Sequence, residues 1–346
     1  MTRPTLGAFR YRIVQGGKAG FIDRLGRVAI QPRFDKQYTF DFAWAERLAA
    51  ACESYARGFG YLDTDGHWRI GPEFIQADGF SEGLAFVKRR GDRVGVYIDV
   101  NGHVRVCPRD VDVVWSFHEG RALAKRGKRY GYIDRRGRWA IPPRFDVAGQ
   151  FSGGAAVVGF GGKDGLINAA GRWLIKPRFE RHSVFGFDQE GLAMVRVGKR
   201  HFYVDRRGDV VIRERGFRIG WSVFRERRAC VKVGKRFGFI DPTGTLVIPP
   251  RFAGASAFSE GLAPVRISSR SGYGYIDRAG EMVIAPRYAN AHPFHNGLAC
   301  VELGGRREVL DALIAERITN QRLAVLVDTK VGYIDMRGKY VWAPTD

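Results

Sequence analysis

The sequence predicts an all-β fold made of tandem repeats, each folded as a three-stranded antiparallel meander. The first observation is a motif that returns every 34 to 40 residues over most of the chain. Its clearest copies are Gly131-Tyr-Ile-Asp134-Arg-Arg-Gly137-Arg-Trp-Ala-Ile141-Pro-Pro143-Arg-Phe145 and Gly238-Phe-Ile-Asp241-Pro-Thr-Gly244-Thr-Leu-Val-Ile248-Pro-Pro250-Arg-Phe252. Repetition at this period is typical of stacked structural units and not of independent domains.

The second observation is that Val, Ile, Tyr and Trp alternate with Arg and Lys over short stretches, as in half-buried strands. We expect about nine to ten units in a single β-repeat body over residues 1–346. That number exceeds the four to eight blades of a typical propeller. We therefore expect the units to stack as an open curved superhelix, with a closed ring or a β-propeller as the alternative.

A turn of the form Asp-x-x-Gly links the second and third strands of each unit. An Asp at the first turn position can accept a hydrogen bond from the backbone two residues on, and Gly supplies the positive φ. The Asp positions are Asp23, Asp63, Asp99, Asp134, Asp205, Asp241, Asp277 and Asp335, with Asn168 in one copy. The Gly positions are Gly26, Gly66, Gly102, Gly137, Gly171, Gly208, Gly244, Gly280 and Gly338.

The remaining segments of each unit also have clear signals. Leu-Ala-x-Val runs predict the first strands at Leu84–Val87, Leu192–Val195, Leu262–Val265 and Leu298–Val301. Each third strand should stop at its Pro, because Pro cannot donate to a ladder. The connector then carries a Phe, such as Phe80 or Phe258, that we expect to pack one unit on the next. Burial of such a ring contributes about 2–3 kcal/mol.

The C-terminal units are irregular, because the step from Asp277 to Asp335 is 58 residues. Val309-Leu310-Asp311 could be a worn copy of the motif. Alternatively, an inserted helix could span Arg306–Ile318, since its apolar residues share a 3.6-residue face. In either case residues 302–346 interrupt the regular stacking, and we expect them to cap it.

These motifs resemble the WG-repeat family of bacterial proteins, whose tandem units read Gly-Tyr-Ile-Asp-x-x-Gly-x-x-Val-Ile-x-Pro followed by Phe-Ser-Glu-Gly-Leu-Ala-x-Val. The resemblance extends from about Tyr11 to Pro344 and implies an all-β binding or scaffolding protein, not a reaction. No Trp-Gly dipeptide is present. The position before the Gly instead holds Ala19, Phe59, Tyr130, Phe237, Tyr273 or Val331.

The formal net charge of +21 is concentrated in the middle of the chain. Residues 101–250 contain 30 Lys and Arg against 14 Asp and Glu, a net charge of +16. Equivalent positions of stacked units align on one side, so these cations should form a row. The Arg residues that we expect to bind a partner are Arg135, Arg136, Arg138, Arg144, Arg172, Arg178, Arg206 and Arg207.

Several interpretations of this row remain open. The Arg after each Pro could pair with a neighbouring Asp in every repeat, and the turn Arg residues could be solvated loop tips. Otherwise the row binds an anionic partner, for which we expect an acidic protein segment held by a non-enzymatic scaffold. Nucleic acid is the first alternative, because Trp68, Trp139 and Trp173 could stack on bases if they are exposed. An enzyme with a site assembled from distant loops is the second.

No residue pattern nominates a catalytic or cofactor site. The repeated Asp residues are turn residues, and a catalytic pair would be local. The Gly-rich segment 161–165 is a loop between two strands and not a strand-to-helix phosphate cradle. His292 and His295 have no third ligand near them in sequence, so we expect no metal and no cofactor.

The sequence also predicts a cytoplasmic location. Residues 1–20 lack the apolar core of a signal peptide, and no run of about 18 apolar residues occurs. The cysteines lie far apart and form no Cys-x-x-Cys pair or disulfide framework. They are Cys52, Cys107, Cys230 and Cys300.

Overall fold

The computed structural model describes residues 9–36, 44–182, 184–220, 222–304, 306–310, 323–327 and 330–343. The chain forms two compact units. Unit 1 comprises Met1–Val231 and Ile240–Thr245, and unit 2 comprises Lys232–Phe239 and Leu246–Asp346. The prediction of a single body stays a prediction.

Unit 1 consists of small antiparallel sheets whose strands pair in chain order. The first sheet contains β1 (Tyr11–Gln15), β2 (Lys18–Ile22) and β3 (Val28–Asp35). A single 3-10 turn, η1 (Ala45–Arg47), precedes a six-stranded sheet. The strands of that sheet are β4 (Ala49–Ala51), β5 (Phe59–Leu62), β6 (Trp68–Ala77), β7 (Ala85–Arg89), β8 (Val96–Ile98) and β9 (Val104–Val106).

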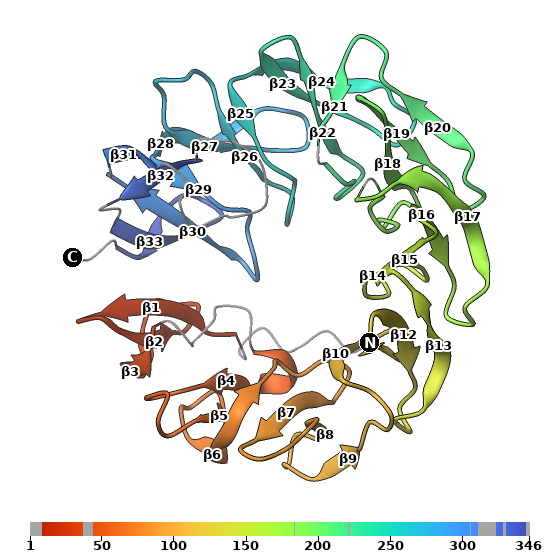
Figure 1. Ribbon diagram of the computed structural model, residues 1–346. Coiled ribbons are helices and arrows are strands. Elements are labelled where there is room, and N and C mark those ends of the chain that lie inside the picture. The colour runs from red at the N-terminus through yellow and green to blue at the C-terminus, as the bar shows by residue number, and fades with distance from the viewer. Residues whose placement is uncertain are drawn as a thin grey trace. The chain divides into compact units, whose positions relative to one another are not determined.

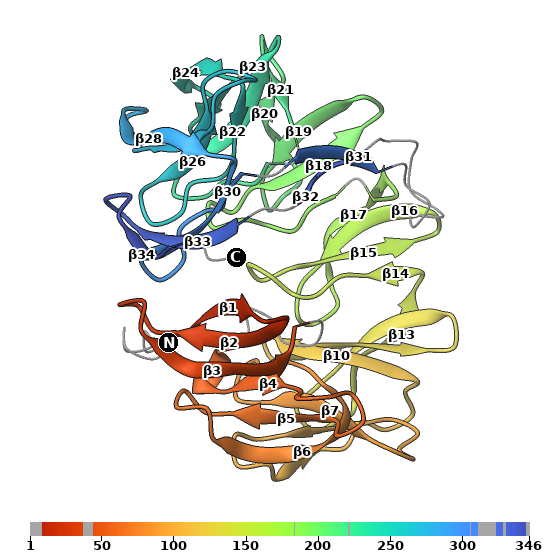
Figure 2. The same cartoon turned by 90° about the vertical axis from the view of Figure 1, so that its left-hand side faces the viewer.

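Three further sheets complete the regular part of unit 1. The first contains β10 (Val113–His118), β11 (Arg121–Arg126), β12 (Arg129–Ile133) and β13 (Trp139–Phe145). The next contains β14 (Val147–Ala148), β15 (Ala156–Phe160), β16 (Lys163–Ile167) and β17 (Trp173–Glu180), which lie side by side in Figure 2. The last contains β18 (Ala193–Val197), β19 (Arg200–Val204) and β20 (Val210–Arg213).

The division between the units passes through β22 and β23. The strands around it are β21 (Arg218–Ile219), β22 (Ala229–Val233), β23 (Arg236–Ile240) and β24 (Leu246–Phe252). Within unit 2, one sheet contains β25 (Gly254–Ala255), β26 (Ala263–Arg266), β27 (Tyr273–Ile276) and β28 (Met282–Tyr288). Another contains β29 (Asn290–Ala291), β30 (Leu298–Leu303), β33 (Lys330–Asp335) and β34 (Tyr340–Trp342). The pair β31 (Arg306–Leu310) and β32 (Leu323–Val327) forms a separate two-stranded sheet.

The fold class is all-β, as predicted, and the described residues contain no α-helix. In each unit the small sheets follow one another along the chain as the blades of a β-propeller (Figure 1). The alternative interpretation is therefore confirmed, and the preferred open superhelix is not supported. The count of units was a poor guide, because the packing between neighbouring sheets, and not their number, determines how they are arranged.

The Asp-x-x-Gly turns fold as predicted. In the second copy, Asp63 Oδ1 accepts hydrogen bonds from the N–H groups of Asp65 and His67, both at 2.9 Å. Gly66 closes the turn by donating its N–H to Asp63 O, with φ at +86°. A second reason for Gly is contact with the preceding blade, since a Cβ there would lie 3.0 Å from Ile30 Cγ2.

Most third strands do not stop at Pro, which corrects the prediction for them, whereas β9 ends at Val106, before Pro108. Strand β13 continues through Pro142 and Pro143 to Phe145, and its register with β12 shifts on both sides of Tyr132. Pro is compatible with such a bulge because it removes no regular ladder bond there. Gly131 permits the close approach, since a Cβ on it would lie 2.4 Å from Ile141 O and 2.8 Å from Pro143 N.

The connector Phe residues join successive blades, as predicted. Phe151 is 3 % exposed, and its ring centroid lies 4.8 Å from that of Tyr132 in the preceding blade. The Tyr132 hydroxyl donates to Gly149 O at 2.7 Å. Equivalent ring pairs occur at Tyr61–Phe80, Tyr97–Phe117, Tyr203–Phe224, Phe239–Phe258 and Tyr275–Phe294.

The helix expected over Arg306–Ile318 does not begin at its first residues, because residues 306–310 form a strand. The worn copy rests on Asp311 and the residues after it, and residues 311–322 lie outside the described part of the chain. In the described part, β30 pairs directly with β33 to form one blade. The hairpin β31–β32 is thus inserted between two paired strands of that blade. Its capping role stays a prediction.

Candidate functional site: a row of turn arginines

The three central Asp-x-x-Gly turns of unit 1 carry most of the predicted partner-binding arginines. Their shape is set by the first residue, since Asp134 Oδ1 accepts the N–H groups of Arg136 at 2.8 Å and Arg138 at 3.1 Å. Burial alone would raise the pKa of Asp134, but these hydrogen bonds and the two guanidinium charges lower it below its ordinary value. The carboxylate of Asp134 is therefore an anion in this turn, and the positive charges of Arg136 and Arg138 partly offset its charge.

In five copies the arginine after the Pro binds the turn of the next blade with its guanidinium group. Arg144 donates to Gly171 O at 2.7 Å, and its Cζ lies 5.0 Å from the centroid of the Phe145 ring. Arg178 donates to Gly208 O in the same way. The equivalent contacts elsewhere are Arg33 to Gly66 O, Arg251 to Gly280 O and Arg287 to Gly338 O. Arg144 and Arg178 are thus structural, and the predicted pairing with a neighbouring Asp is wrong for these contacts.

The arginine directly after the turn Asp is also structural. Arg135 donates to Glu82 O and to Glu82 Oε2, each at 2.9 Å, and covers the Phe117 ring. Arg206 donates to Gly153 O at 2.6 Å, with its Cζ 4.8 Å from the centroid of the Phe187 ring. Both guanidinium groups connect the turn to a connector loop, so neither is primarily a partner contact.

All eight predicted residues are exposed, and we name four of them the turn cations: Arg136, Arg138, Arg172 and Arg207. Within the described residues, their side chains make no hydrogen bond or ion pair. The turn cations belong to three turns. The guanidinium contacts of Arg144 and Arg178 show that these turns lie on successive blades. The turn cations therefore occupy equivalent places along one edge of the central blades.

The turn cations differ from two cations of the N-terminal turns, Arg27 and Arg105, which have anionic partners. Arg27 contacts Asp23 at 2.8 Å, and Arg105 contacts Asp99 at 2.7 Å. Hydrogen bonds from His103, Arg105 and Asn101 outweigh burial and lower the pKa of Asp99 to about 2. In the turn of Arg172 the neutral Asn168 replaces the Asp, which removes the local partner.

Some cations at the opposite end of the central strands are also paired. The loop between β11 and β12 is at the other end of β12 from the Asp134 turn, because strand direction alternates in a meander. There Arg126 pairs with Asp110, and Arg129 pairs with Asp146. Arg181 also reaches Asp146, at 2.8 Å. The described cations at the turn edge are thus less neutralised than these.

Trp68, Trp115, Trp139 and Trp173 do not provide an exposed stacking surface. Trp139 and Trp173 are half-buried against core clusters, and Trp173 makes an edge contact with Phe145. Trp68 is half-buried beside Phe34. Trp115 is half-buried against Tyr130.

Neither a metal centre nor a membrane-spanning helix occurs in the described ranges. No group of three or more His, Cys, Asp or Glu side chains there could hold a metal ion. No helix in these ranges is sufficiently long and apolar to cross a membrane.

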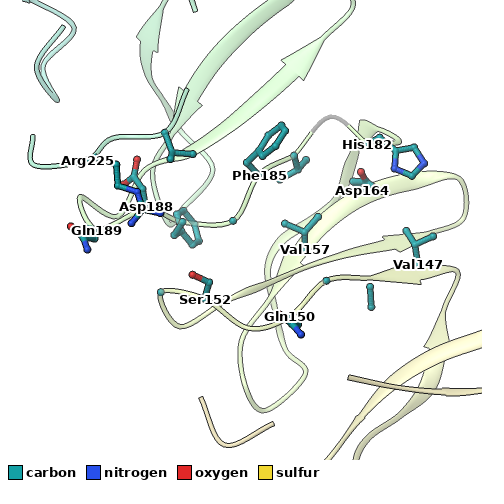
Figure 3. A pocket seen from close by; sticks show the side chains of 17 residues that line it. Val147, Gln150, Ser152, Val157, Asp164, His182, Phe185, Asp188, Gln189 and Arg225 are labelled. Atoms are coloured by element: carbon teal, nitrogen blue, oxygen red, sulfur yellow. The ribbon is translucent and has the colours of Figure 1, made fainter. Parts of the chain in front are cut away.

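A pocket that sequence analysis missed lies in the blade β14–β17 (Figure 3). Its volume is about 720 Å³, and its lining comes from β14, β15, β16 and the connectors, with residues 149, 150, 152, 153, 182, 184–189, 223 and 225. Asp164 lines it and is only 3 % exposed. The segment 161–165, predicted only as a loop, therefore continues into a strand that bears a buried carboxylate.

Comparison with known proteins identifies the repeat. The family described as "WG containing repeat" matches residues 20–45, 59–91, 130–163, 165–200, 237–269 and 273–306, which together exceed half of the chain. The chain belongs to the WG-repeat family. No curated protein matches it significantly.

One solved structure supports the fold of this WG-repeat chain. A structure described as the eukaryotic initiation factor is similar with a TM-score of 0.59 at 11% identity, over 96% of this chain and 94% of that one. Apo AztD from Citrobacter koseri has a TM-score of 0.42 at 14% identity, over 79% of this chain and 93% of its own. At these identities the first likeness concerns the fold alone, and the second carries no argument.

The family match also marks where this WG-repeat chain departs from its own pattern. Four matched segments begin at the aromatic residue before the Gly, at Phe59, Tyr130, Phe237 and Tyr273. The segments starting at Gly20 and Gly165 begin one residue later, and the aromatic position there is occupied by Ala19 and Asp164. The departure at Asp164 was visible in the sequence and could have pointed to the pocket.

Proposed function

We propose that this WG-repeat chain is a non-enzymatic scaffold that binds an acidic protein segment with its four turn cations. The observation that carries the proposal is that Arg136, Arg138, Arg172 and Arg207 are exposed on successive turns without an ion pair in the described structure. Arg is suited to this task, because its planar guanidinium binds carboxylates with two parallel hydrogen bonds.

The arrangement favours an extended partner. The turns are attached to the neighbouring blades by the Arg144 and Arg178 contacts, so the row has little freedom to reorganise on binding. A preorganised surface loses less conformational entropy when a ligand binds. An acidic peptide crossing successive blades would place a carboxylate at each turn.

The surrounding charge also favours an anionic partner. The chain carries a net +21, and the central residues 101–250 carry +16 of it. Such a field accelerates encounter with a polyanion, in a manner that depends on ionic strength. Half-buried Trp139 and Trp173 leave little aromatic surface for bases, which supports an acidic protein over nucleic acid.

Charge reversal tests the proposal. We expect the quadruple variant R136E/R138E/R172E/R207E to bind a fluorescein-labelled poly-glutamate 12-mer at least about tenfold more weakly than the wild type, as measured by anisotropy. The matched control is R24E/K36E/R90E/R93E, which removes the same charge from other exposed positions of unit 1. It should retain most of the affinity.

Three outcomes would contradict the proposal. Equal losses in the two quadruple variants would mean that only net charge matters. Retained binding in the turn variant would move the site elsewhere. Tighter binding of a 12-base-pair DNA than of poly-glutamate at about 150 mM salt would support the nucleic-acid alternative, since nonspecific DNA binding weakens steeply with salt.

A further inference from the structure

The pocket in the blade β14–β17 replaces a cation–ring pair that other blades keep. Lys125 and Tyr130 pair directly across β11 and β12, with the Lys Nζ 5.5 Å from the ring centroid. Lys232 over Phe237 and Arg266 over Tyr273 repeat this pair in unit 2. In the β14–β17 blade the two positions are occupied by Gly159 and Asp164. A long cation and a ring have thus been exchanged for a hydrogen atom and a short carboxylate.

Val147 belongs to the same exchange. A Cβ on Gly159 would lie 2.7 Å from Val147 Cγ2, so the glycine is needed for the valine to pack there. In the blade β25–β28 the sizes are reversed, because Gly254 pairs with Arg266 and a Cβ on Gly254 would lie 3.2 Å from the Tyr273 hydroxyl. The three residues of the pocket blade are therefore mutually adapted.

Asp164 is the only charged side chain that is buried among the described residues. Burial of a carboxylate is costly unless a positive or hydrogen-bonding group faces it. The two oxygens of a carboxylate accept several hydrogen bonds, so contacts within the protein leave capacity for a ligand. The nearby guanidinium of Arg181 is bonded to Asp146 at 2.8 Å.

Among the other polar groups of the pocket, His182 lies beside Asp164 in Figure 3. Asp188 accepts the N–H groups of Glu190, Leu192 and Phe224, which fix its connector. Figure 3 shows Arg225 on the opposite side of the pocket from Asp164. The walls between them are largely apolar and include Val147, Val157, Val184, Phe185 and Phe187.

We propose that this pocket binds a primary ammonium group carried on an apolar body, with Asp164 as its counter-charge. The volume of about 720 Å³ falls within the usual range of ligand pockets, roughly 300–1,000 Å³. The apolar walls accommodate an alkyl chain, and the buried carboxylate receives the –NH₃⁺ donors. The ammonium can come from a free amine or from a lysine side chain of a peptide.

Hexylammonium chloride is a suitable probe, with 1-hexanol as its neutral match. Titration followed by NMR should show saturable binding of hexylammonium to the wild type and weaker binding of hexanol. Asp164→Asn keeps the shape and removes the charge, and should weaken hexylammonium binding by at least about tenfold without affecting hexanol. Asp209→Asn removes an exposed carboxylate of the same chain and should change neither.

A second variant keeps the test decisive if Asp164→Asn fails to fold. The double substitution Val147→Gly with Asp164→Tyr recreates the Gly254 and Tyr273 arrangement, and the ring should fill the pocket and abolish binding of both probes. Absence of hexylammonium binding to the wild type would overturn the proposal, as would equal binding to wild type and Asp164→Asn. The turn-cation variant should bind hexylammonium normally, so this site fails or succeeds independently of the acidic-partner surface.

A binding experiment with peptides distinguishes the two possible sources of the ammonium group. A short apolar peptide with one central lysine is compared with the same peptide carrying norleucine. Preference for the lysine peptide over hexylammonium supports a peptide as the ligand, and the reverse preference supports a free amine. Equal binding of the lysine and norleucine peptides would contradict a role for the charge.

Discussion

The consecutive blades β10–β13 and β14–β17 follow one scheme, yet they differ along a single face of the middle strand. Tyr130, Tyr132 and Asp134 of the first blade correspond to Asp164, Leu166 and Asn168 of the second. Residues two apart on a strand share a face, so these substitutions are neighbours in space. The intervening Gly131 and Ile133 are identical to their counterparts Gly165 and Ile167.

The unchanged face is the one that packs on the preceding blade. Ile133 belongs to a core cluster with Leu84 and Tyr97, whereas Leu166 clusters with Phe179 of β17 and with Phe187 of the connector that follows. The other face of the middle strand carries the substituted residues Asp164, Leu166 and Asn168. These substitutions give the blade β14–β17 both a pocket and a neutral turn. The comparison suggests that a repeat acquires function where its contact with the next unit is relaxed.

Removal of the ring that joins these two blades should have the largest effect. Phe151 belongs to a cluster containing Tyr132 and Phe145 of one blade and Ile167 of the next. Phe151→Ala is expected to lower the free energy of unfolding by about 3–5 kcal/mol, through lost burial and a residual cavity. Urea unfolding followed by tryptophan fluorescence measures this loss.

The matched control is Phe160→Ala, which truncates a ring that is 48% exposed in the same blade. It should cost less than about 1 kcal/mol. Similar losses in the two variants would mean that Phe151 does not hold the blades together.

A smaller effect is expected from the hydroxyl that Tyr132 contributes to the first blade and that Leu166 lacks in the second. Tyr132→Phe removes the donor to Gly149 O and should cost about 0.5–1.5 kcal/mol. Burial raises the pKa of Tyr132 above its ordinary range, so the hydroxyl stays protonated and able to donate. The control Tyr130→Phe alters a half-buried ring and should be nearly neutral; if it cost as much, the Gly149 bond would not be the cause.

The sequence predicted those features of the two blades that depend on interactions within a single repeat unit. Alternating strands, Asp-x-x-Gly turns and the connector Phe follow from backbone geometry and ring burial within one unit. The role of Arg144 did not follow, because its acceptor is the carbonyl of Gly171 in the next blade. The recurrence of an Arg after the Pro and of a Gly in the turn was nevertheless a usable signal of contact between units.

The candidate sites were predicted less completely than the fold. Four of the eight proposed partner-binding arginines have structural contacts, which a charge count cannot distinguish from solvated side chains. The pocket depends on Val147, Gly159 and Asp164, which are distant in the motif but adjacent across three strands. Only the register between strands reveals that their substitutions are coupled.

The smallest effect concerns the turn, and it has a defined pH dependence. The folded pKa of Asp134 lies below its unfolded value, so the stability that its carboxylate contributes is complete above about pH 5. This contribution is lost as pH falls through the folded pKa. Asp134→Asn should therefore be less stable than the wild type at neutral pH, and the difference should shrink below about pH 4 in urea unfolding measured across pH.

The reverse substitution, Asn168→Asp, should introduce the same pH dependence into the second blade. Asn168 Oδ1 already accepts the N–H groups of Ala170 and Arg172, both at 3.0 Å, so a carboxylate would take over existing hydrogen bonds. It would also give Arg172 the anionic partner that this turn lacks. Asn168→Asp should thus stabilise the fold slightly above about pH 5 while weakening poly-glutamate binding. Unchanged peptide affinity would indicate that Arg172 does not contribute to the acidic-partner surface.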